Sequence, residues 1–75
     1  MKGIKNREEN ILIALSDSFI SIEQVYLNDR DRMLAIEYKQ IEGIRDILIA
    51  NRETLSPYYL NMIDRCDAIL KDRVK

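Results

Sequence analysis

Spaced carboxylates are the side chains of this 75-residue chain that come nearest to a catalytic or metal-binding arrangement. Glu42 and Asp46 lie four residues apart, so in a helix they would share one face. Asp64 and Asp67 lie three residues apart and would also share a face. Paired carboxylates can act as general acid and base or bind a cation. Glu42 also has Arg45 three residues on, however, and opposite charges at this spacing are typical of a solvated helix face.

The chain lacks the other residues that enzyme sites commonly need. It has no histidine, two glycines and one cysteine, which excludes a Ser-His-Asp or Cys-His pairing, a zinc-ligand cluster and a glycine-rich phosphate loop. Cys66 lies on an apolar stripe with Arg65 as its only adjacent cation, so we expect a small buried hydrophobe and not a reactive thiol. We therefore expect no catalytic residue, no cofactor and no metal, and a protein that is not an enzyme.

The elements that must position any site are helical. Apolar periodicity predicts an all-α fold, a three-helix antiparallel bundle in a single domain over residues 1–75, with helices at about 6–27, 30–52 and 57–74. Both joins are short enough to fold neighbouring helices antiparallel. An alternative stays open in which the first two helices merge into one long rod that pairs with a second chain. The apolar pattern changes phase at the first join, which favours three helices.

Capping residues and proline place the predicted helix ends. Asn6 with Glu9 three residues on is a candidate N-cap and capping box, which makes residues 1–5 a frayed N-terminal tail. Asn28–Asp29 interrupts the apolar pattern at the first join, where either side chain could cap the second helix. Ser56–Pro57 predicts the start of the third helix, because proline fits the first helical turn and disfavours helix in the residue before it.

The first two helices are apolar on two faces each. In the first helix the core stripe consists of Leu12, Leu15, Phe19, Ile22 and Tyr26, and a second set consists of Ile13, Ile20 and Leu27. In the second helix the core stripe consists of Met33, Ile41, Ile44 and Leu48, and the second set consists of Ile36, Gln40, Gly43, Ile47 and Ala50. A chain of this length has too little other surface to cover both faces, so we expect a homodimer or larger assembly through these two helices.

Gly43 indicates where such a contact would be closest. Glycine in a helix interior costs about 1 kcal/mol relative to alanine, which is most simply explained by another helix backbone crossing closely there. We therefore predict self-association through Ile36, Gln40, Gly43, Ile47 and Ala50 of the second helix, together with Ile13 and Ile20 of the first.

The third helix carries a single apolar stripe, which is typical of a helix on the outside of a bundle. The stripe consists of Tyr59, Ile63, Cys66 and Leu70, flanked by Met62 and Ile69. No signal-peptide pattern opens the chain, and no apolar run reaches the roughly 20 residues that a membrane span needs. We therefore expect a soluble, cytoplasmic protein without a membrane partner.

The join between the second and third helices carries a family resemblance. The stretch 49–65 has Ala50 near the end of one helix, and apolar Leu55, Leu60 and Ile63 in the turn and the next helix. This stretch resembles the helix-turn-helix of AraC-type regulators. The resemblance implies a dimeric DNA-binding regulator with these residues toward the major groove: Ser56, Pro57, Tyr58, Asn61 and Met62. Glu53, Thr54 and Asp64 depart from the family pattern.

Electrostatics favours a protein partner over nucleic acid. Affinity for duplex DNA comes largely from neutralised phosphates, whereas this chain has a net charge of −1 and no basic stripe. Exposed tyrosine and arginine often anchor protein interfaces, so Tyr58, Arg65 and Tyr38 are candidates for contacting a partner protein. An equally simple interpretation is that Tyr58 only shields the start of the third helix.

These observations favour a small, non-enzymatic, protein-binding module that self-associates and acts by occupancy, as an adaptor, inhibitor or anti-regulator. Small accessory proteins of phages or mobile elements are often of this kind. Its expected partners are a second copy of itself and an unidentified protein. A dimeric helix-turn-helix-like DNA-binding regulator that uses the 49–65 segment is the alternative, and a structural assembly subunit is the third possibility.

Overall fold

The protein folds into three α-helices, which confirms the all-helical prediction. The computed structural model describes residues 2–74, and side chains from residue 10 to residue 73. The helices are α1 (Lys2–Asn28), α2 (Ala35–Ala50) and α3 (Pro57–Val74), joined by two 3-10 turns, η1 (Arg30–Arg32) and η2 (Arg52–Thr54). No strand occurs within the described part of the chain.

Helix α1 is longer at its start than the sequence predicts. It begins at Lys2, four residues before Asn6, so Asn6 lies inside the helix and is not its N-cap. The predicted frayed tail of residues 1–5 is therefore helical from Lys2 on, and Met1 lies outside the described residues. The absence of Pro and the single Gly in this segment explain why the helix can continue through it.

The first join separates α1 from α2, so the two helices do not form one rod. The carboxylate of Asp29 accepts a hydrogen bond from the Asp31 amide at 3.2 Å and caps η1. Met33 and Leu34 are extended, and α2 begins only at Ala35, five residues after the predicted start. The cause is Glu37, whose Oε1 accepts from the Leu34 amide at 2.8 Å and so satisfies an otherwise unpaired donor at the helix start.

The second join follows the prediction closely. Helix α2 ends at Ala50, where the side-chain amide of Asn51 donates to the carbonyl oxygen of Ile47 at 2.8 Å. Helix α3 begins at Pro57, as predicted. The carbonyl oxygen of Ser56 accepts from the amides of Tyr59 and Leu60 and starts the helical hydrogen bonding.

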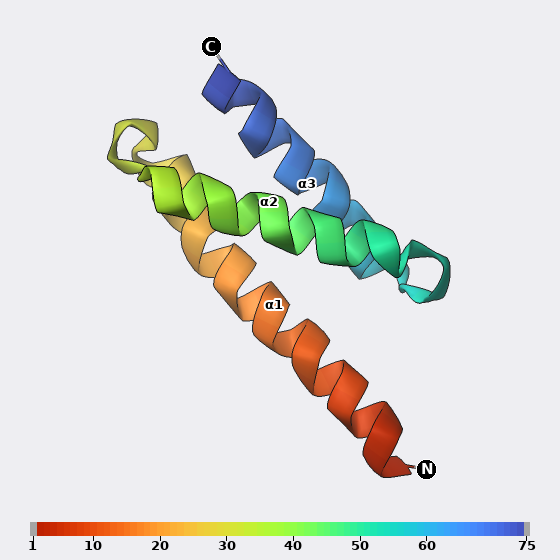
Figure 1. Ribbon diagram of the computed structural model, residues 1–75. Coiled ribbons are helices and arrows are strands. Elements are labelled where there is room, and N and C mark those ends of the chain that lie inside the picture. Colours follow the sequence, from red (N-terminus) through yellow and green to blue (C-terminus); the bar gives the residue numbers. More distant parts are fainter. Residues whose placement is uncertain (1, 75) are drawn as a thin grey trace.

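Helix α2 runs back along α3, while α1 and α3 run in the same direction (Figure 1). The Tyr58 and Ser16 hydroxyls are 2.9 Å apart, and farther along both helices the Tyr26 hydroxyl donates to Asp72 at 2.7 Å. The first half of α1 extends beyond α2 and α3 and gives the molecule its length, 45 Å against 19 and 18 Å in the other directions. Among the described side chains of α1, contacts with the core begin at Leu12.

The core lies where the three helices meet. Eight apolar side chains are buried there: Phe19, Ile22, Ile41, Ile44, Leu48, Met62, Cys66 and Ile69. Each comes from a predicted stripe or its flank. The α2 stripe is confirmed at Ile41, Ile44 and Leu48, while Met33 packs against the core from the join and not from a helix.

Helix α3 is rotated relative to the predicted stripe. Met62 and Ile69, which the sequence predicts at the flanks, are buried, whereas Tyr59, Ile63 and Leu70 are only partly buried. The reason is that α3 packs against two helices and not one. Its α1-facing side includes Tyr58 and Arg65, so the buried stripe turns toward α1.

Two isoleucines of α2 provide a matched test of this packing. Ile41 is fully buried and Ile36 is 62% exposed. Ile41→Val should lower the free energy of unfolding by about 0.5–1.5 kcal/mol, because it removes one buried methyl group and leaves a small void. Ile36→Val should change the free energy of unfolding by less than about 0.5 kcal/mol. Urea unfolding followed by circular dichroism measures both, and equal losses would contradict the assigned burial.

Candidate binding surface

The second apolar set of α2 is not covered by the rest of the chain. Ile36 and Ile47 are 62% and 44% exposed, and Gly43 and Ala50 are also exposed. A Cβ atom added at Gly43 would meet nothing within 4 Å, so no other part of the chain crosses there. With Gln40, also exposed, these residues form an uncharged stripe along α2, which we call the α2 seam: Ile36, Gln40, Gly43, Ile47 and Ala50.

The predicted self-association residues of α1 lie on a different side of the molecule. Ile13 and Ile20 are 50% and 37% exposed. They lie three residues before Ser16 and Glu23, which bond to α3, so they border the α1–α3 contact. The structure therefore does not bring Ile13 and Ile20 onto one face with the α2 seam.

A shallow hollow lies where α1 approaches the start of α2. Its lining includes Ser21 and Val25 of α1, Leu34 at the join, and Glu37 of α2. Leu34 is one of the most exposed large apolar side chains. No residue of the α2 seam lines this hollow, and Gln24, which does, lies four residues after Ile20 on the same face of α1.

Two of the predicted partner-binding residues are engaged within the chain. Arg65 donates to Glu23 through Nε at 3.1 Å and through a second, shorter contact from Nη2, and this raises the pKa of Arg65. Its guanidinium carbon also lies 5.0 Å from the ring centroid of Phe19. Tyr58 is half exposed, but its hydroxyl is hydrogen bonded to buried Ser16.

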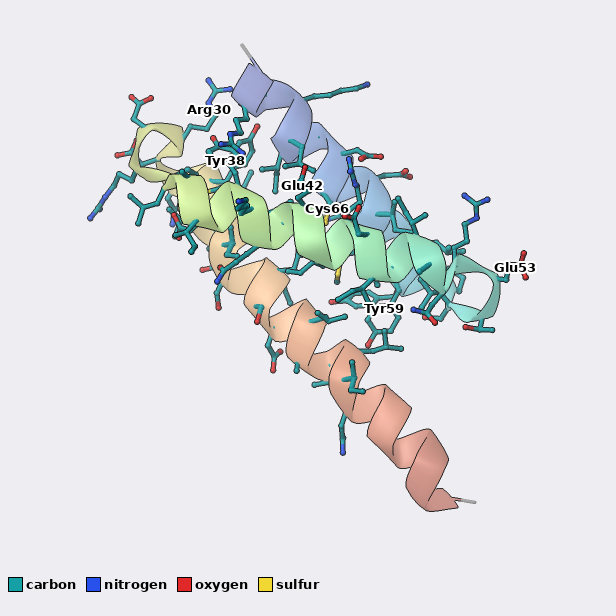
Figure 2. All side chains as sticks on the ribbon, viewed as in Figure 1. Arg30, Tyr38, Glu42, Glu53, Tyr59 and Cys66 are labelled. Atoms are coloured by element: carbon teal, nitrogen blue, oxygen red, sulfur yellow. The ribbon has the colours of Figure 1, made fainter. Side chains whose placement is uncertain are left out.

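The third candidate, Tyr38, belongs to a polar cluster at the C-terminal end of α3 (Figure 2). The guanidinium of Arg73 lies 5.0 Å from the Tyr38 ring centroid. Nearby, Asp72 accepts hydrogen bonds from Tyr26 and Arg30, and the contact with Asp72 raises the pKa of Tyr26. The cluster fastens the end of α3 to α1 and the first join.

These polar contacts are the part of the structure that sequence reasoning missed. The contacts between α1 and α3 join residues more than 40 positions apart, so no local spacing predicts them. Ser16 offered one signal. It lies four residues after Leu12 and three before Phe19, so it falls on the core side of α1, where a buried hydroxyl needs a partner.

The 49–65 segment forms a helical hairpin and not the crossed pair of a helix-turn-helix. Arg45 in the middle of α2 donates to Asp67 in the middle of α3 at 3.1 Å. Tyr38 near the start of α2 contacts Arg73 near the end of α3. Contacts between α2 and α3 thus continue to the far end of both helices, as in an antiparallel hairpin, whereas the two helices of a helix-turn-helix meet at roughly 90–120°. Ser56, Tyr58 and Asn61 are exposed at the turn, beside Glu53, which points away from the helices (Figure 2).

The carboxylates and the cysteine that the sequence offers as candidate catalytic or metal-binding residues do not come together in one site. Glu42 and Asp46 are exposed on α2, and Asp67 is paired with Arg45, apart from exposed Asp64. Among the described residues, no three metal-binding side chains come together. Cys66 lies behind α2 in Figure 2 and is fully buried, as predicted; burial raises the pKa of its thiol to about 12.

Within the described residues, no helix has both the length and the apolar content required to cross a membrane. Comparison of the chain with protein families, curated proteins and solved structures found no match.

Cys66 can report on whether the core opens. In the folded chain its thiol is neutral at pH 8, because ionisation requires a pH near 12, whereas an unfolded thiol has a pKa of about 8.5. The rate of reaction with an aromatic disulfide reagent should therefore be lower by roughly a thousandfold in native buffer than in denaturing urea. An Ala68→Cys variant, with its new thiol on an exposed site, should react quickly in both. Equal rates for Cys66 in both solvents would contradict its burial.

Proposed function

We propose that this protein is a non-enzymatic, cytoplasmic protein-binding module that self-associates and acts by occupancy, as an adaptor, inhibitor or anti-regulator. The observation that carries the proposal is the uncovered α2 seam. In the described part of the chain, ten large apolar side chains are exposed while eight apolar side chains form the core. Single exposed apolar residues are ordinary, but a continuous uncharged stripe along one helix marks an interaction site.

The surface fits a helix better than a small molecule. The α2 seam is a convex helix face whose residues recur at steps of three and four, which is the spacing by which two helices pack side by side. Two hollows in the described part of the chain are open, are lined largely by polar side chains and include no residue of the seam. A helix from another chain would cover Ile36 and Ile47 without any change in the core.

Tyr58 provides a second, smaller contact region next to the exposed Asn61. Its ring stacks edge-on against Tyr59 at 5.0 Å, and its hydroxyl is held by Ser16, so the side chain is ordered before any partner binds. Preordered aromatic side chains lose little freedom on binding and are frequent interface anchors. A partner protein could bind Tyr58 while the α2 seam is occupied, since the two lie on different helices.

The test is the molar mass in solution over a hundredfold range of concentration, measured by light scattering after size exclusion. The wild-type mass should rise toward that of a dimer. Ile47→Lys should keep the chain monomeric, because it places a charge in the seam without touching the core. Ile49→Lys, on the same helix but outside the seam, is the matched control and should self-associate like the wild type. A wild-type monomer at every concentration would contradict the proposal that the protein self-associates.

A further inference from the structure

Two charged side chains border the α2 seam along one edge. Lys39 and Asp46 each directly precede a seam residue, Gln40 and Ile47, and lie seven residues apart on the same side of the helix. Both are exposed, and the Asp46 side chain keeps 65% of its accessible surface. Its ion pair with neighbouring Arg45 is long, at 3.5 Å. Both charges are therefore available to a second chain.

We propose that the α2 seam packs antiparallel against the α2 seam of a second copy, with a twofold axis between Gln40 and Gly43. In this register Ile36 of each chain faces Ile47 of the other, and Gln40 of each faces Gly43 of the other. The inference rests on the proposed self-association and adds the identity of the occupant and the geometry of the contact.

The charges select this register. In an antiparallel helix pair the same edge of each helix meets, so Lys39 of each chain lies beside Asp46 of the other, twice per dimer. Moving the second copy by one heptad in either direction brings Asp46 against Asp46 or Lys39 against Lys39, and both are repulsive. A parallel pair would place this edge beside Ile44 and Asn51, with no opposite charge.

The seam is also complementary in shape in this register. Glycine weakens a helix interior, and nothing in the chain fills the space above Gly43. Gln40 of the second copy, a long side chain without charge, lies over that space. The two Ile36–Ile47 pairs lie one layer farther from the twofold axis on each side. Large side chains therefore face each other in the outer layers, and the long Gln40 faces the small Gly43 in the central layers.

The size of the contact predicts a weak dimer. A 16-residue helix is about 24 Å long, and one face of it offers on the order of a few hundred Å². Stable complexes usually bury about 800 Å² on each partner. We therefore expect a dimer that dissociates on dilution, with a dissociation constant in roughly the micromolar range or above.

A pair of charge reversals tests the register. Lys39→Glu and Asp46→Lys should each raise the homodimer dissociation constant roughly tenfold, because each variant places like charges together twice. An equimolar mixture of the two should form a heterodimer with nearly wild-type affinity, because opposite charges then face each other at both positions. Sedimentation equilibrium measures all three samples, and circular dichroism checks that each variant is folded.

Two controls match the change in net charge without touching the edge of the seam. Lys71→Glu and Asp64→Lys, both at exposed positions of α3, should dimerise like the wild type. If the wild type dimerises but the mixture does not restore binding, the antiparallel register is wrong while the proposed self-association stands. If the wild type stays monomeric at every concentration, both the register and the proposed self-association are wrong.

Discussion

Ile41, Ile44 and Leu48 connect the three helices from the middle element of the chain, and the rest of the structure depends on their burial. Because α1 and α3 both pack on this one side of α2, no helix within residues 2–74 covers the other side. The length of the chain imposes that limit, since a domain of this size can bury only part of its apolar surface. The exposed α2 seam is thus a consequence of how the core forms.

The contact between α1 and α3 differs in character from the contact between α2 and its neighbours. Three polar links hold α1 against α3, from Ser16 at one end to Tyr26 at the other, with the Glu23–Arg65 pair between them. Such links require a particular geometry between the two helices, but where they are solvent exposed they add little to the free energy of unfolding. They also engage Tyr58 and Arg65 within the chain, and Arg73 of α3 contacts Tyr38, which leaves the apolar seam as the larger free surface.

Periodicity in the sequence was enough to predict three helices, the start of α3 at Pro57 and the buried stripe of α2, because these depend on local spacing and on proline. The late start of α2 was not predicted, since it results from Glu37 bonding back to Leu34, a residue without a polar side chain. The rotation of α3 was missed for another reason: it depends on contacts with α1 more than 40 residues away. The separation of Ile13 and Ile20 from the α2 seam likewise required the packing of whole helices.

Disulfide cross-linking between two copies tests the central claim, that the α2 seam of one chain covers the same seam of another, most directly. Ile36→Cys and Ile47→Cys chains, mixed and mildly oxidised, should form the mixed dimer in preference to either homodimer, because in the antiparallel register position 36 of one chain faces position 47 of the other, while two copies of either position lie apart. The wild type, whose Cys66 is buried, should not cross-link. Preferential homodimers of Ile36→Cys would indicate parallel seams, and no cross-linking above the wild-type level would contradict the account.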